Sequence, residues 1–153
     1  AATGNEFSKR VFDMAEKQGN QAVVISAAIE SEVALLESAE EQKEFLETLG
    51  LAETGLNRVI AAGYKLLNLK TFFTVGPKES KAWTIRDGMT APQAAGVIHS
   101  DFEKGFIRAE VISYEDFIVC KSEAKAREMG KLRSEGKTYV MQDGDICHFL
   151  FNV

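Results

Sequence analysis

Apolar residues recur at helical spacing through most of residues 1–68. The first such stretch carries four of them: Phe7, Val11, Met14 and Ala15. The same pattern predicts further helices that start near Glu30, Ser38 and Thr54. Residues 22–25 (Ala-Val-Val-Ile) differ because they are continuously apolar, which is typical of a strand buried on both faces in a parallel sheet. We therefore expect residues 1–68 to be mainly helical with one strand.

From residue 69 onward the pattern changes to that of strands. Residues 71–75 and 82–86 alternate apolar and polar side chains, as half-buried strands do. A short helix is expected over 90–98, opened by a capping box, and a last strand over 146–151 is apolar on both faces, as a central strand is. Strand, strand, helix, strand is the beginning of a β-grasp fold, so we expect an α+β class with one mixed sheet around that helix. The predicted core has ten members: Phe73, Ile85, Ala95, Ile98, Phe106, Val111, Phe117, Val140, Ile146 and Phe149.

Charge divides the chain at the same place. The net charge is −5, and residues 1–68 hold 6 Lys and Arg against 11 Asp and Glu, whereas residues 69–153 hold 12 of each sign. An acidic first part is poorly suited to binding a nucleic-acid backbone, where cations must replace counterions. Within the neutral second part, residues 121–137 carry six cations and three carboxylates. This locally positive segment is either a contact for RNA phosphates or a solvated surface.

Cysteine and histidine usage indicates neither disulfides nor a metal. Cys120 and Cys147 are too few for a disulfide framework or a zinc site and are expected to be reduced, partly buried thiols. His99 and His148 lack the spacing of metal ligands, so no metal site is expected. No apolar run is long enough to span a membrane, and the first ten residues do not resemble a signal peptide. These features predict a cytoplasmic chain with no membrane partner.

Four short stretches, in order along the chain, carry a resemblance to a known family. They are AWTI at 82–85, APQAAG at 91–96, IHSDFEKGFIR at 98–108 and QDGDI at 142–146. Together they resemble the TGS domain of the YchF/Obg-like ATPase family, bacterial type, a family of P-loop NTPases that bear this module at their C-terminus. The resemblance extends to residues 1–68 and implies two domains. Residues 1–68 would be a mainly helical remnant of the α/β nucleotide-binding (G) domain, and residues 69–153 a β-grasp, ubiquitin-like TGS domain.

The phosphate-binding loop of such NTPases does not occur in this sequence. It requires the pattern G-x-x-x-x-G-K-[ST], and although Gly50 and Gly55 have the spacing, Leu56 and Asn57 follow them. The resemblance implies that the intact protein binds ATP, or GTP, with Mg²⁺, hydrolyses it and associates with ribosomal particles. This chain alone is expected to hold no cofactor and to be inactive. Its expected partners are the ribosome or ribosomal RNA and its own N-terminal G-domain part, but not DNA.

One nucleotide-related signal remains. Ser26, Ala27 and Ala28 follow the predicted strand, and the resemblance implies that they contact the nucleotide base, because ligands of open α/β sheets bind beyond the carboxyl ends of strands. From the residues alone we favour a serine cap followed by two alanines in the first turn of a helix, and only the resemblance favours base contact, in the intact protein.

Further candidates lie in residues 69–153. His99, Asp101, Glu103 and Lys104 crowd a loop that could mimic an acid/base site, although turn capping by Asp101 is the interpretation we favour. Trp83 is either a stacking platform for an unpaired RNA base or a packing residue. The candidate contacts with RNA or the ribosome are Lys121, Lys125, Arg127, Lys131, Arg133 and Trp83. The alternative function is a stand-alone β-grasp module that binds RNA or a protein without nucleotide chemistry.

Overall fold

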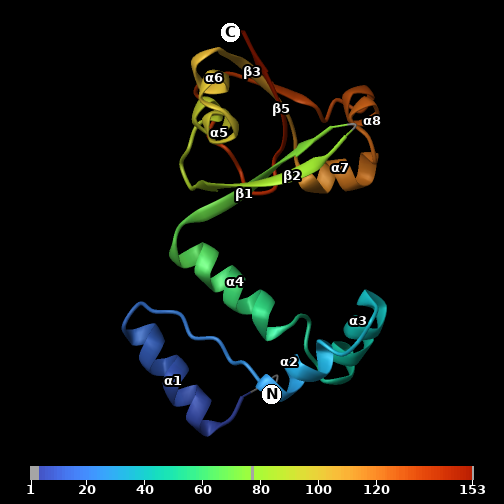
Figure 1. The fold of residues 1–153 in the computed structure, drawn as a ribbon. Coiled ribbons are helices and arrows are strands. Elements are labelled where there is room, and N and C mark those ends of the chain that lie inside the picture. Colours follow the sequence, from blue (N-terminus) through green and yellow to red (C-terminus); the bar gives the residue numbers. More distant parts are fainter. Residues whose placement is uncertain (1–3, 77, 153) are drawn as a thin grey trace. The chain divides into compact units, whose positions relative to one another are not determined.

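The computed structural model describes residues 4–76 and 78–152. The chain forms two compact units, Ala1–Leu67 and Asn68–Val153. Among the described residues the first unit contains four helices, and the second contains five strands and four helices (Figure 1). None of these helices is both long and apolar enough to cross a membrane.

The first unit is built from capped helices. Its helices are α1 (Glu6–Lys17), α2 (Ala27–Val33), α3 (Ala39–Thr48) and α4 (Gly55–Leu66). Each one is preceded by a residue whose side chain accepts a hydrogen bond from a backbone N–H of the first turn, which satisfies a donor that the helix itself cannot. These residues are Asn5, Ser26, Ser38 and Thr54. The predicted helices of this unit are thus confirmed, including the capping box between Ser38 and Glu41.

The predicted strand at residues 22–25 is wrong. Residues 21–25 form no backbone–backbone hydrogen bond with another described residue, and Ile25 is 51% exposed. A strand needs a neighbour to pair its N–H and C=O groups, and the described part of this unit contains no other strand. The apolar run therefore stays irregular and only partly buried.

The helices of the first unit enclose a small core and leave apolar faces uncovered. Val33, Leu46 and Leu51 form the core, with Ile29 and Phe45 beside them. In contrast, large apolar side chains of α1 and α4 are exposed to solvent: Phe7, Val11 and Met14 on α1, and Leu56, Val59 and Ile60 on α4. Large apolar side chains that are exposed together commonly mark a contact with other protein.

The second unit is built on one mixed sheet. Its strands are β1 (Leu69–Val75), β2 (Ser80–Arg86), β3 (Phe106–Ile112), β4 (Arg133–Glu135) and β5 (Ile146–Phe151), in the order β2-β1-β5-β3-β4. Strands β1 and β5 are parallel, and the other neighbouring pairs are antiparallel. This order, with α5 (Ala91–Ile98) between β2 and β3, is the β-grasp arrangement, so the predicted fold is confirmed. Strand β5, apolar on both faces, is central as expected.

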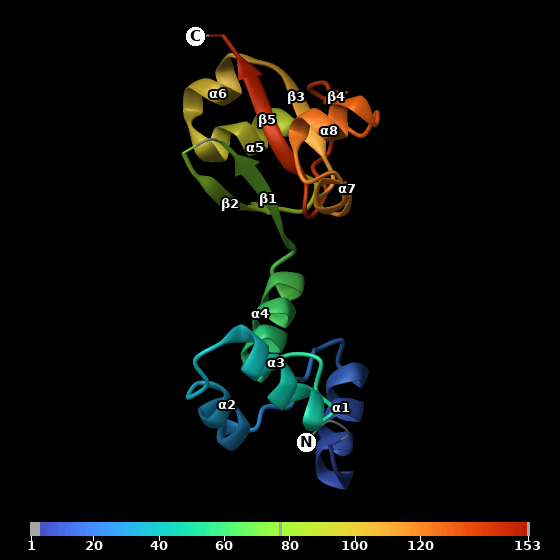
Figure 2. The same ribbon diagram turned by 90° about the vertical axis from the view of Figure 1, so that its right-hand side faces the viewer.

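Helices cover both faces of this sheet. Successive residues of a strand point to opposite faces, and Val111 accordingly belongs to the larger core with Ala94 and Ala95 of α5. Ile112 packs on the other face with Cys120 and Ala126. The first face is therefore covered by α5, with α6 (Ser100–Lys104) next to it, and the second by α7 (Tyr114–Cys120) and α8 (Glu123–Glu128) (Figure 2).

Two of the ten predicted core residues are wrong by one position. Phe72 is fully buried, whereas the predicted Phe73 is half-buried on the opposite face beside Tyr114. Met141 is likewise fully buried, and the predicted Val140 is 40% exposed. In both places two large apolar residues are adjacent, so alternation alone does not indicate which of them faces the core.

A buried polar cluster lies at the start of β5, around Asp145. Asp145 is 2% exposed and accepts hydrogen bonds from the Tyr139 hydroxyl at 2.8 Å and the Gln142 backbone N–H at 2.9 Å. The Arg133 guanidinium lies 3.5 Å from the same carboxylate. Burial, and then the hydrogen bond to Asp145, raises the pKa of Tyr139 to about 12. The cluster thus holds a neutral phenol against a buried carboxylate.

Tyr139→Phe is expected to change how the stability of the second unit depends on alkaline pH. Because the pKa of Tyr139 is raised on folding, the contribution of the neutral phenol is complete below pH 10 and is lost as the pH rises from 10 towards 12. Urea denaturation, followed by the fluorescence of Trp83, should show a steeper loss of stability over this range for the wild type than for the variant. Parallel profiles would contradict this. Below pH 10 the variant should be less stable by about 1 kcal/mol.

Candidate functional site

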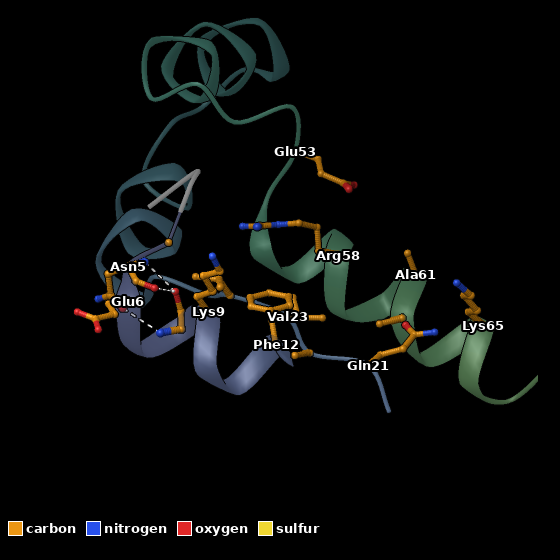
Figure 3. A pocket seen from close by; sticks show the side chains of 15 residues that line it. Asn5, Glu6, Lys9, Phe12, Gln21, Val23, Glu53, Arg58, Ala61 and Lys65 are labelled. Carbon is orange, nitrogen blue, oxygen red and sulfur yellow. Dashed lines mark hydrogen bonds between the residues drawn. The ribbon is translucent and has the colours of Figure 1, made fainter. Parts of the chain in front are cut away.

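A large pocket lies in the first unit. Its volume is about 760 Å³, and it is lined by residues of α1, of the unpaired segment 21–24 and of α4. Figure 3 shows Phe12 of α1 and Val23 of the segment together with Ala61 of α4 at this pocket. The pocket therefore lies beside the segment that the sequence predicted to be a buried strand.

Cations gather at this pocket although the unit is acidic. Lys9, Arg58 and Lys65, three of the six cations of residues 1–68, line it, against two of the eleven carboxylates, Glu6 and Glu53. Glu6 is paired with Arg10 at 3.2 Å. Sequence reasoning missed this site, because its cations are 7 to 56 positions apart and only the fold brings them together.

Ser26, Ala27 and Ala28 lie at the start of α2. The Ser26 hydroxyl accepts a hydrogen bond from the Ile29 N–H at 3.5 Å, and the two alanines occupy the first turn with exposed side chains. Their own N–H groups are first-turn donors, which have no partner within the helix. None of the three residues lines the pocket. The local geometry is that of a helix cap, and the described residues place no second half of a nucleotide site beside it.

Glu30 joins α2 to α4. Its carboxylate accepts hydrogen bonds from the backbone N–H groups of Gly55, at 2.7 Å, and Leu56, at 3.4 Å, at the start of α4. A carboxylate is stabilised there because the N-terminus of a helix is electropositive. Sequence reasoning treated Glu30 only as a helix residue, and no local pattern indicates a contact across 25 positions.

Tertiary ion pairs neutralise three of the six cations in the locally positive segment 121–137. Arg127 lies 3.2 Å from Glu110 of β3, Lys131 lies 3.1 Å from Asp116 of α7, and Arg133 approaches Asp145. Hydrogen bonds from Lys131 and then Ser113 lower the pKa of Asp116. The three carboxylates outside the segment thus add to the three within it, and the apparent excess of positive charge disappears.

Lys121 and Lys125 of this segment have no ion pair with a described residue outside their own helix. Lys125 pairs only within α8, with Glu128 at 3.0 Å, and both side chains are exposed. Lys121 follows α7 in a left-handed conformation, with φ of 60°, and forms no ion pair with the described residues. Lys121 and Lys125 are therefore the two candidate residues best placed to reach an external anion.

Trp83 is placed apart from these residues. It lies on β2, at one edge of the sheet, whereas Arg133 lies on β4 at the other edge. Its ring stacks on Phe72 with centroids 6.4 Å apart, its Nε1–H donates to Thr74 at 3.0 Å, and the Lys81 ammonium lies 4.0 Å from the ring centre. These contacts favour the packing interpretation of Trp83, because a base could stack on it only after Lys81 moved away.

The remaining candidates are the cluster at residues 99–104, of which Asp101, Glu103 and Lys104 lie on helix α6 and not in the predicted loop, and the two cysteines. The His99 ring, not Asp101, caps α6, since its Nδ1 accepts from the Asp101 N–H at 3.2 Å. Cys120 and Cys147 are free, buried thiols, and burial raises the pKa of Cys147. Within residues 4–76 and 78–152 no group of three or more His, Cys, Asp or Glu side chains could hold a metal ion.

The fold is a helical unit followed by a β-grasp unit, as the sequence resemblance implied. Comparison with known families identifies the family. The YchF-GTPase_C family, described as a protein of unknown function (DUF933), matches residues 69–152. The chain belongs to the YchF family.

Relatives match nearly the whole chain. Over 149 residues it is 62% identical to a protein of Pasteurella multocida (strain Pm70) and 58% identical to one of Escherichia coli O157:H7, each named "Ribosome-binding ATPase YchF". The aligned regions cover 97% of this chain but 41% of each relative. The chain thus spans about two fifths of the length of these relatives.

Two solved structures resemble the fold. The structure of the Schizosaccharomyces pombe YchF GTPase matches 97% of this chain with a TM-score of 0.80 and 37% identity, and 39% of its own chain is covered. A GTP binding protein from Pyrococcus horikoshii OT3 matches 99% of this chain with a TM-score of 0.65, over 43% of its own chain. At 23% identity the second likeness shows the fold alone.

Proposed function

We propose that this chain acts as the C-terminal part of a cytoplasmic protein that binds and hydrolyses ATP, or GTP, with Mg²⁺ and associates with the ribosome. The observation that carries this proposal is the 62% identity over 97% of the chain to a protein named "Ribosome-binding ATPase YchF". That relative is much longer than the aligned region. The sequence of residues 1–153 has no phosphate-binding loop, so the phosphates and Mg²⁺ would be held by other parts of the protein.

Within this function, the first unit completes the nucleotide-binding domain. The uncovered faces of α1 and α4 and the unpaired segment 21–25 would pack against the sheet of the G-domain part. Ser26, Ala27 and Ala28 would contact the nucleotide base at the edge of that sheet, as the sequence resemblance implies.

The second unit would provide the contact with the ribosome or its RNA. Of the five cations that sequence reasoning proposed, Lys121 and Lys125 are free of tertiary ion pairs, so they would meet phosphates at the lowest energetic cost. Arg127, Lys131 and Arg133 would contribute only after exchanging an internal carboxylate for a phosphate. Contacts of this kind are salt-dependent and largely independent of sequence.

Charge reversal tests this contact. In a chimera in which this chain replaces the matched 41% of the Pasteurella multocida relative, Lys121→Glu with Lys125→Glu should weaken co-sedimentation with ribosomes and flatten its salt dependence, while ATP turnover stays unchanged. The control, Lys78→Glu with Lys104→Glu, makes the same change of charge elsewhere on the second unit and should sediment as wild type. Equal sedimentation of the two variants would show that the contact lies elsewhere, and the Trp83 edge would be tested next.

One observation favours the stand-alone binding module as a second candidate. The β-grasp unit encloses a complete core of its own, which includes Phe72, Val111 and Phe149. We expect such a unit to fold without the G domain. If residues 68–153 alone bound ribosomes as tightly as the chimera does, with no effect of nucleotide, the module interpretation would hold for the contact.

A further inference from the structure

A second cavity lies in the β-grasp unit, between the face of the sheet that α7 and α8 cover and the turn that joins these two helices (Figure 2). Its volume is about 270 Å³, and its apolar walls include Ile112, Phe117, Leu132 and Ile146. Protein interiors are packed as densely as organic crystals and contain few voids larger than a water molecule. An apolar cavity of about 150 Å³ is already large enough to hold benzene. The space beside α7 can therefore accept a small organic molecule.

Two side chains with unpaired hydrogen-bond donors line the same cavity. The ammonium of Lys121 and the exposed ring of His148 form no hydrogen bond or ion pair with the described residues. An ammonium carries three N–H donors, and an imidazole carries at least one. Lys121 also has a φ of 60°, a left-handed backbone conformation that residues other than glycine seldom adopt. A lysine held in this way at the opening of an apolar cavity is a candidate ligand-binding residue.

The carboxylates of the cavity are already neutralised by arginines. Glu110 is paired with Arg108 and with Arg127, at 3.2 Å in each case. Glu123, the other carboxylate of the lining, lies 3.1 Å from the same Arg127 guanidinium. The charged group that remains without a partner at this cavity is thus the ammonium of Lys121, and the cavity is suited to an anion.

We propose that this cavity binds a small amphipathic anion, whose apolar body fills the space between the sheet and α7 and whose carboxylate contacts the ammonium of Lys121. The ring N–H of His148 is the second donor to the carboxylate. Sites for small molecules are commonly built in this way, with apolar walls that provide most of the contact and a few polar groups that fix the orientation. The inference concerns the β-grasp unit alone and does not rest on the proposed function.

Methyl NMR of the isoleucines tests whether the ligand enters this cavity. Ile112 and Ile146 line it, whereas Ile85 belongs to the core on the opposite face of the sheet and Ile60 is exposed on α4. In the full-length chimera, octanoate should shift the methyl signals of Ile112 and Ile146 in a saturable way, with a Kd of about 1 mM or below. Acetate, which has the charge but no apolar body, should shift neither signal. Absence of a saturable shift, or shifts at Ile60 in place of these two, would overturn the site.

Comparison of a charged with an uncharged ligand tests the role of Lys121. Octanamide has the same apolar body as octanoate without the charge and should bind about tenfold more weakly, since hydrogen bonds to charged groups are the stronger ones. Lys121→Gln should weaken the binding of octanoate by about the same factor and leave octanamide unchanged. The control is Lys125→Gln, which removes a cation of the same segment that does not line the cavity, and it should bind octanoate as the wild type does. Equal affinities of the wild type for the two ligands, or equal effects of the two substitutions, would refute the contact with Lys121.

Val75→Trp tests the cavity itself. Val75 lines the cavity and is 45% exposed, so the strand can carry a larger side chain there without a change in the core. The indole should occupy the opening and weaken both octanoate and octanamide by about tenfold or more, because both need the same apolar space. An unchanged methyl signal of Ile85 would show that the fold is intact. Undiminished binding by such a folded variant would place the ligand elsewhere and overturn the proposal.

Discussion

Phe72→Ala is expected to lower the free energy of unfolding of the second unit by about 3–5 kcal/mol. Phe72 is fully buried, and its ring lies 6.4 Å from that of Trp83 and 5.7 Å, edge-on, from that of Phe149. Truncation would remove these contacts and leave a cavity between the sheet and α5, which close-packed neighbours fill only in part. Urea denaturation monitored by Trp83, the only tryptophan, reports on this unit specifically.

Two further variants show whether the loss comes from the core. Val119→Ala, on the 72% exposed Val119 of α7, should change stability by no more than about 0.5 kcal/mol. Phe73→Ala, on the half-buried face of β1, should cost clearly less than Phe72→Ala. If Phe73→Ala proved the more costly of the two, the assignment of the faces of β1 would be wrong.

The mistaken choice of Phe73 shows the limit of apolar/polar alternation as a guide to the buried face of β1. Alternation in the sequence correctly predicted β1 and β2, and a run that is apolar on both faces correctly predicted β5, whereas no pattern predicted the short strand β4. It could not choose between the faces of β1, where Phe72 and Phe73 are adjacent and both faces are covered by helices. Only the packing of α5 against the sheet decides which ring is central.

The first unit shows a different limit. Its helices were predicted because caps and apolar spacing are local features, and the structure contains all of them. The strand at 22–25 was not formed, because pairing is a non-local property and no described residue offers a partner. Residues 22–24 of the apolar run that predicted a buried strand line the pocket instead.

The candidate contacts were predictable only as residue types. The six cations of residues 121–137 are evident in the sequence, but Glu110, Asp116 and Asp145, which neutralise three of them, come from β3, α7 and the turn before β5. Local counting of charge therefore overstates the positive potential of a segment when the fold brings distant carboxylates to it.

Gly105→Ala is expected to destabilise the second unit by about 1–3 kcal/mol or more, because there is no room for a side chain. Gly105 lies between α6 and β3, and a Cβ there would overlap the backbone carbonyl oxygen of Asn152. A backbone atom cannot turn aside as a flexible side chain can, so the end of β5 would have to move. That movement would break the Asn152 N–H to Gly105 C=O hydrogen bond of 2.9 Å and separate Phe151 from Phe102, whose rings stack 3.8 Å apart.

The matched control is Gly136→Ala. No atom lies within 4 Å of a Cβ at Gly136, and its backbone is outside the left-handed region, so an alanine there should be neutral or stabilise the unit by up to about 1 kcal/mol by restricting the unfolded chain. Denaturation of both variants with Trp83 fluorescence gives the comparison. Equal stabilities would mean that the C-terminal end of β5 separates from Gly105 at little cost in free energy. Hydrogen exchange of the Asn152 amide would then be as fast in the wild type as in Gly105→Ala. A large difference, with fast exchange at Asn152 only in Gly105→Ala, would show that the close approach of the two backbones holds the last strand at the centre of the sheet.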